Sequence, residues 1–225
     1  VWILNPNGIY FGPSSYVNVS GVMASTLDLH NQNDFMSGLN HVQFKPFSGD
    51  DYEASISSSV VNKGTIVSES GLAALVAPGV ANYGVIRANL GNVVLGSGTQ
   101  YTMDFYGDGL INFVIDKGLL VRPTAYDDSM DSLIDTMVAI DQRGDVIAEG
   151  GSILIQTGSA VEVLDNIINL SGNMRATSYE EVAGHIGVYG NSSTVNISGF
   201  LDVAGNDAGE AGGSVHVFAQ FIDVE

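Results

Sequence analysis

The stretch that decides the fold runs from Trp2 to Leu29 and reads WILNPNGIYFGPSSYVNVSGVMASTLDL. Short apolar runs in it are separated by compact turns at 5–8, 12–13 and 20–21, each of which contains glycine. Asn-Gly is a strong turn signal because both residues tolerate positive φ, and Pro6 presets φ for the approach. We therefore expect a coil wound from short strands, with the turn at 5–8 shaping its beginning.

The same pattern returns along the chain as two repeating units. The first has Asn shortly before Gly, as at Asn62 and Asn82, which lie 20 residues apart. Its Asn residues are predicted to occupy corners, where each amide can bond the backbone or the equivalent Asn one turn away. These corner positions are Asn18, Asn62, Asn82, Asn169 and Asn196. The second unit starts at Gly71, Gly91, Gly151, Gly184 and Gly213. Repeats of this length indicate a solenoid.

Aliphatic residues recur on one face of each short strand, as in residues 80–88. A parallel coil places that face inside, where each row of Val, Ile and Leu packs on the same row of the next turn. Barrels need longer strands joined by hairpins, whereas the turns here are frequent and regular. The sequence predicts an all-β fold, a right-handed parallel β-helix that forms a single domain over residues 1–225.

Two segments interrupt the repeats, which otherwise fill 1–95 and 141–225. Residues 31–53 place aromatic residues among polar ones, and we expect them to form an extra-helical hairpin or loop on the outside of the solenoid. Residues 125–140 carry apolar residues at i, i+3, i+4, i+7 and i+8 from Met130 to Val138, with acidic residues near the start. This periodicity predicts one short inserted helix that lies across the solenoid surface.

Composition limits the partners. The chain has 25 acidic and 7 basic residues, a formal net charge of -18. Such a field repels phosphate backbones and anionic lipid, so we expect no nucleic-acid partner. No apolar run approaches the about 20 residues that span a bilayer, so we expect no membrane insertion. The absence of cysteine excludes disulfides and thiolate metal sites. Val1 is not an initiator methionine, so we expect the sequence to be a fragment of a longer protein.

The residues give no catalytic pattern. Enzymes that cleave polysaccharides on a β-helix need clustered carboxylates, with a Lys or Arg base or a second carboxylate at a defined distance, whereas the basic residues here are scattered. His185 and His216 occupy comparable positions in two units, and we expect them to stack rather than to bind a metal. The aspartates between 127 and 135 lack the spacing of calcium loops. We expect no catalytic residue, metal or cofactor; a carbohydrate-active lyase or hydrolase is the alternative.

A family resemblance rests on three motifs taken together: NPNGIYFG at 5–12, VNVSGVMASTLDL at 17–29 and DFMSG at 34–38. In this order they resemble the two-partner secretion (TPS) domain, or haemagglutination activity domain, at the N-terminus of filamentous-haemagglutinin-type exoproteins. The resemblance is strongest over 1–95 and looser up to 225. It implies a β-helix, and the family's N-terminal cap would precede Val1.

The resemblance also implies a function. The chain would be a non-enzymatic secretion and adhesion module, recognised by the periplasmic domains of a dedicated outer-membrane transporter. It would be released or presented at the cell surface of a Gram-negative-type bacterium, where the parent protein could bind a host or cell-surface receptor or a glycan. The residues that match the family's secretion motif are Asn5, Pro6, Asn7, Gly8 and Ile9. The alternative is a turn kept for its backbone geometry, which would act on secretion through folding.

Overall fold

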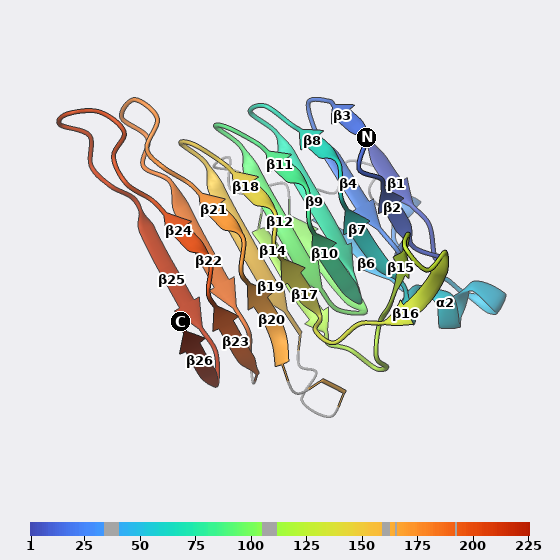
Figure 1. Cartoon of the computed structure of the whole chain (residues 1–225). Coiled ribbons are helices and arrows are strands. Elements are labelled where there is room, and N and C mark those ends of the chain that lie inside the picture. The colour runs from blue at the N-terminus through green and yellow to red at the C-terminus, as the bar shows by residue number, and fades with distance from the viewer. Residues whose placement is uncertain (34–40, 105–111, 159–162, 165, 192) are drawn as a thin grey trace.

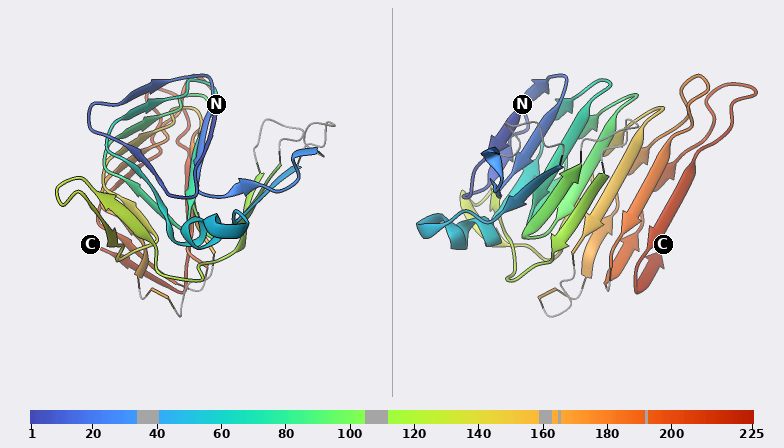
Figure 2. Two further views of the ribbon diagram at one scale, coloured as in Figure 1. Left: turned by 90° about the vertical axis from the view of Figure 1, so that its right-hand side faces the viewer. Right: turned by 180° about the vertical axis from the view of Figure 1, so that it is seen from behind.

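The computed structural model of the chain describes residues 1–33, 41–104, 112–158, 163–164, 166–191 and 193–225. Three parallel sheets, named A, B and C here, run along its length, and successive turns of the chain add one strand to each sheet in the same order (Figure 1). Seen along the axis, the coils superimpose (Figure 2). The predicted all-β parallel solenoid is therefore confirmed.

The strands of the three sheets are short. Sheet A contains β1 (Trp2–Leu4), β4 (Val22–Ser25), β9 (Leu72–Ala77), β12 (Asn92–Ser97), β19 (Ser152–Thr157), β22 (His185–Tyr189) and β25 (Ser214–Phe218). Sheet B contains β2 (Ile9–Phe11), β7 (Ser59–Asn62), β10 (Gly79–Asn82), β17 (Ile140–Gln142), β20 (Asn166–Leu170), β23 (Thr194–Ile197) and β26 (Phe221–Val224). Sheet C contains β3 (Tyr16–Asn18), β8 (Thr65–Val67), β11 (Val85–Arg87), β18 (Asp145–Ile147), β21 (Asn173–Arg175) and β24 (Phe200–Asp202).

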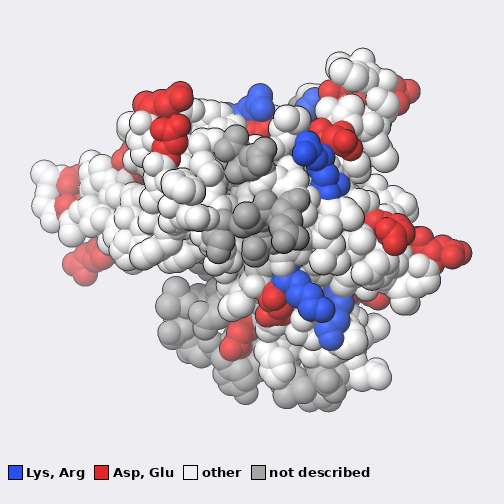
Figure 3. Space-filling view, turned by 90° about the horizontal axis from the view of Figure 1, so that it is seen from below, with Lys and Arg blue, Asp and Glu red and all other residues white. Residues whose placement is uncertain are grey.

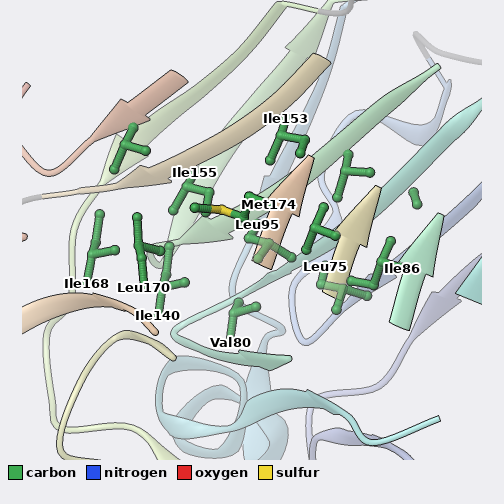
Figure 4. Close-up of a cluster of buried hydrophobic side chains, with 14 of the residues drawn as sticks. Leu75, Val80, Ile86, Leu95, Ile140, Ile153, Ile155, Ile168, Leu170 and Met174 are labelled. Atoms are coloured by element: carbon green, nitrogen blue, oxygen red, sulfur yellow. The ribbon is translucent and has the colours of Figure 1, made fainter. Parts of the chain in front are cut away.

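Neighbouring coils stack in register, so like side chains meet inside. In sheet B, Val80 pairs with Val60 on one side and with Ile140 on the other. Figure 4 shows such aliphatic residues from different coils gathered in one cluster, and most of them are fully buried. Each such side chain contributes about 1.5–3 kcal/mol relative to an exposed one. The interior rows are therefore the main source of stability, as the alternating pattern predicts.

Glycine columns allow the coils to approach closely at two corners. A Cβ atom on Gly84 would lie 2.1 Å from the carbonyl oxygen of Gly64 in the coil below, and one on Gly91 would lie 2.2 Å from that of Gly71. These carbonyl groups accept the amides of Val85 and Asn92, at 2.9 Å and 2.8 Å. A side chain at these corners would separate the coils and break the hydrogen bonds between them.

A four-stranded antiparallel sheet, sheet D, covers the outer face of sheet A at its N-terminal end (Figure 2). Its strands are β5 (Asp28–Leu29), β6 (His41–Lys45), β13 (Gln100–Asp104) and β14 (Asn112–Lys117). Phe44 stacks on Tyr101 with ring centroids 4.5 Å apart, and both side chains are fully buried. The sequence pattern indicated an extra-helical element in 31–53 but not its pairing with 100–117.

Helix is scarce in the described residues. After β6, the segment 31–53 continues into a 3-10 turn, η1 (Gly49–Asp51), and leads to a six-residue helix, α2 (Tyr52–Ser57). The motif DFMSG at 34–38 lies outside the described residues. Within the described ranges, every helix is too short or too polar to cross a lipid bilayer.

The inserted helix predicted over 125–140 is wrong. Strands β15 (Thr124–Asp127) and β16 (Ser132–Asp135) form an antiparallel hairpin there, in which Tyr126 pairs with Leu133. The carboxylate of Asp127 accepts bonds from the backbone amides of Ser129 at 2.8 Å and Met130 at 3.3 Å, and Asp131 has φ of 50°. This turn reverses the chain, and pairing between the strands replaces the helical bonds that the periodicity suggested.

Two of the five asparagines predicted at corners take part in a buried ladder of side-chain amides. The side-chain amide of Asn62 donates to Asn82 at 2.8 Å, and that of Asn82 donates to Gln142 at 2.8 Å. Gln142, which the sequence reading missed, donates in turn to the carbonyl oxygen of Gly144 at 2.7 Å. These three side chains are fully buried and form a ladder across three coils.

The other three asparagines do not join this ladder. Asn18 lies exposed in sheet C, where it pairs with Val67. Asn169 and Asn196 are in register with Asp141, one position before the ladder, so their side chains point to the opposite face of sheet B. Their unit has one extra residue between Asn and Gly, and in a strand of period two that shift turns the side chain outward.

The buried ladder gives a prediction. We expect Asn82→Ala to lower the free energy of unfolding by roughly 2–4 kcal/mol, because it leaves buried polar groups of Asn62 and Gln142 without this partner. Asn196→Ala is the matched control, since its side chain faces outward, and it should cost less than about 0.5 kcal/mol. Denaturant unfolding of the two variants measures the difference. Equal losses would show that the ladder adds nothing to stability.

Candidate functional site

The NPNG motif forms the turn between β1 and β2 in the first coil. The amide of Asn5 donates to Ser25 in the next coil at 3.0 Å, and the amide of Gly8 donates back to Asn5 at 3.2 Å. The side-chain oxygen of Asn5 accepts the amide of Asn7 at 3.1 Å. Gly8 has φ of 99°, a conformation that favours glycine. These bonds fix the backbone of the turn, while the side chains of Asn5 and Asn7 stay exposed.

Pro6, Gly8 and Ile9 complete the predicted motif and are half-buried. A Cβ atom on Gly8 would lie 3.1 Å from the carbonyl oxygen of Ser59. This position therefore leaves little room for a side chain and also has a left-handed backbone conformation. Ile9 pairs with Val60 and packs against the core. The motif therefore combines structural residues with two asparagines whose side chains reach solvent.

The hairpin β15–β16 lies over the first two coils on the outer face of sheet B (Figure 1). The rings of Tyr10 and Tyr126 meet edge to face with centroids 5.2 Å apart. Lys63, in the second coil, forms an ion pair with Asp128 in the hairpin turn, and its ammonium group lies 5.9 Å from the centroid of the Tyr10 ring. The sequence pattern did not indicate this cluster, because its two halves lie far apart in the chain, and the ion-paired Lys63 and Asp128 are separated by 65 positions.

The cluster shifts the titration of its members. Burial, followed by the neighbouring Asp128 carboxylate, raises the pKa of Tyr10 to about 12. The hydrogen bond from Lys63, followed by the neighbouring Tyr10 hydroxyl, holds the pKa of the Asp128 carboxylate below its usual value. Tyr10 is neutral and Asp128 is charged at neutral pH, as they would be with their ordinary pKa values, so the attraction between Lys63 and Asp128 is present there.

A cavity of about 230 Å³ lies between the motif and the hairpin. It is lined by residues 7–10 of the first coil, by Ser59 and Val61 of β7, and by Thr124, Tyr126 and Leu133 of the hairpin. The motif, the second coil and the hairpin thus form one surface from three separate parts of the sequence.

A second polar cluster lies further along sheet B. The carboxylate of Asp141 accepts bonds from Tyr83 at 3.0 Å, from Arg143 at 2.9 Å and from Asn169 at 2.8 Å. Burial, then Asp141, raises the pKa of Tyr83 to about 12. Both carboxylate oxygens of Asp141 already accept hydrogen bonds. Asp141 therefore holds this network of side chains together and is not placed to act as a general base.

The two histidines singled out in the sequence do meet. Their rings lie 5.0 Å apart and edge to face, although His185 is in register with Ser214, and His216 with Gly187, so they are diagonal neighbours. Burial, then His216, lowers the pKa of His185, whose Nδ1 lies 2.8 Å from the Ser214 hydroxyl. Within the part of the chain that the structure describes, no three His, Asp or Glu residues are grouped as metal ligands.

Comparison with known families identifies the fold and the class of module. The model of the TPS secretion domain matches residues 1–217. The chain belongs to this family. It is a secretion domain, as the resemblance in the opening motifs implied.

A solved relative supports the fold. The secretion domain of HMW1 from Haemophilus influenzae superposes with a TM-score of 0.59 at 23% identity. The alignment covers 91% of this chain and 54% of that one, so this TPS domain spans about half the length of that structure. No curated protein sequence matches the chain.

The hairpin contact gives a prediction with a pH dependence. The folded pKa of Asp128 is depressed, so its contribution to stability is present above the unfolded value of about 3.9 and is lost as the pH falls through the folded value. We expect Asp128→Asn to be less stable than the unsubstituted domain at pH 7, and the difference to shrink steadily as the pH falls below about 3.9. Thermal unfolding from neutral to acidic pH measures it, with Asp135→Asn on the same hairpin as the control. A difference that stays the same at every pH would mean that the charge of Asp128 has no role.

Proposed function

We propose that this TPS domain is the non-enzymatic secretion and adhesion module of a large exoprotein, recognised by the periplasmic domains of its cognate outer-membrane transporter. After transit through the periplasm of a Gram-negative-type bacterium, the exoprotein is presented at the cell surface or released. The family match over residues 1–217 carries this proposal. The exposed asparagines of the first coil, in the motif that resembles the family's secretion motif, support it.

The shape and charge of the domain suit this role. A solenoid whose coils are joined by continuous hydrogen bonds is a rigid body that can hold further segments away from the cell. The net charge of -18 keeps it soluble and away from anionic lipid. Binding of a host receptor, a cell-surface receptor or a glycan belongs in this proposal to the parent protein.

The motif is tested by secretion. We expect replacement of Asn5 and Asn7 together by Ala, in the parent protein, to lower the secreted yield several-fold, because their exposed side chains are part of the surface that the transporter reads. Asn18→Ala is the matched control, as Asn18 is an exposed asparagine of the same coil outside the motif. Immunoblots of medium and cell fractions measure the yield. A normal secreted yield would show that the transporter does not recognise these two side chains.

The partner is tested by direct binding. The purified periplasmic domains of the transporter should bind the folded domain in titration calorimetry, and the Asn5/Asn7 variant should bind more weakly. Circular dichroism of the variant separates a lost contact from a lost fold, because Asn5 also bonds the backbone of its own turn. If the unsubstituted domain does not bind, the domain is a structural surface repeat instead.

A further inference from the structure

The cavity between the motif and the hairpin has the features of a docking site for a peptide segment. Its volume of about 230 Å³ is below that of usual sites for small molecules and suits one or two side chains. Ile9 and Val61 provide apolar surface at its base, and Leu133 stands over it with 61% of its surface exposed. The hairpin region also exposes the apolar side chains of Met130, Ile134 and Met137. A group of such side chains marks an interaction surface better than one leucine would.

Two residues that line the cavity, Tyr10 and Ser59, have a buried hydroxyl without a hydrogen-bond partner within the described residues. Ser59 is only 5% exposed, and its hydroxyl makes no hydrogen bond within the described residues. It lines this cavity and also the neighbouring one of about 220 Å³ on the other side of the hairpin, which Ile134 and Met137 border. A buried hydroxyl without a partner is costly, and an entering peptide group could bond to it.

Charge around the cavity favours a basic occupant. The hairpin carries Asp127, Asp128, Asp131 and Asp135 within a chain of net charge -18. Lys63 offsets only one of them, through its ion pair with Asp128. Acidic side chains are also spread across the face of the molecule seen from below (Figure 3). A segment with Lys or Arg beside its apolar side chain would be drawn to this site.

We infer that the cavity between residues 7–10 and the hairpin β15–β16 receives an apolar side chain, flanked by Lys or Arg, from the periplasmic domains of the transporter. The inference rests on the proposed function and extends it. The transporter would then recognise a surface that the fold assembles from separate parts of the sequence. Residues 124–133 contribute to it as much as the motif does. The apolar side chain lies against Ile9, Val61 and Leu133, and the backbone beside it bonds to the hydroxyl of Ser59.

The test compares two exposed leucines. Leu133→Asp places a charge at the mouth of the cavity, and we expect it to weaken binding of the purified periplasmic domains at least about tenfold. Leu120→Asp is the matched control, because Leu120 is 55% exposed and is not among the residues that line the cavity, and it should change the affinity less than about twofold. Affinity for the unsubstituted domain should fall with added salt.

Ser59→Ala provides a readout that a structural role would not give. Removing a hydroxyl without a partner should leave the unfolding temperature unchanged or higher, while binding weakens about three- to tenfold. If Leu133→Asp binds as tightly as Leu120→Asp while the Asn5/Asn7 variant loses binding, the motif alone is read and the cavity inference is wrong. If the unsubstituted domain does not bind at all, the proposed function fails as well.

Discussion

Close approach of successive coils at the glycine corners is the constraint on which the rest of this structure depends. At Gly84 and Gly91 the chain passes within van der Waals distance of the carbonyl group of the coil below, and no side chain fits between them. With the corners fixed, the interior rows fall into register and the ladder of backbone hydrogen bonds continues from coil to coil. The side chains can then vary at the outward-facing strand positions, and segments can be inserted at the third corner, between sheets A and B. Sheet D, α2 and the hairpin are all formed by segments inserted at that corner.

The parts of the fold that depend on local pattern could be predicted from the sequence. Glycine spacing and alternating aliphatic residues gave the solenoid, and the Asn-Gly pattern gave the buried amides of Asn62 and Asn82. The same reasoning failed for Asn169 and Asn196, because one extra residue before the glycine reverses the side-chain direction in a strand. It also missed Gln142, which carries the same amide one methylene further out.

Elements that depend on distant pairing could not be predicted in this way. The apolar spacing of residues 130–138 fits a helix, yet residues 132–135 pair with the nearby strand 124–127 in a hairpin. The surface that supports this hairpin lies far away in the sequence. Sheet D likewise needs strands from residues 28–45 and 100–117 together. For the candidate site, the motif could be found from its residues, whereas its contact with Tyr126 and Asp128 needed the structure.

The way in which the hairpin reaches back over the first coils affects the order in which the domain can form. Coils added one upon another could condense from the N-terminal end as the chain appears, since each new rung needs only its predecessor. Tyr10 and Lys63, however, meet their partners only when residues 126–128 are present. Contacts of such long sequence separation slow folding, because a large loop must close before they form. The beginning of this domain is therefore completed late, and a truncation before residue 124 would leave it less stable than its own coils suggest.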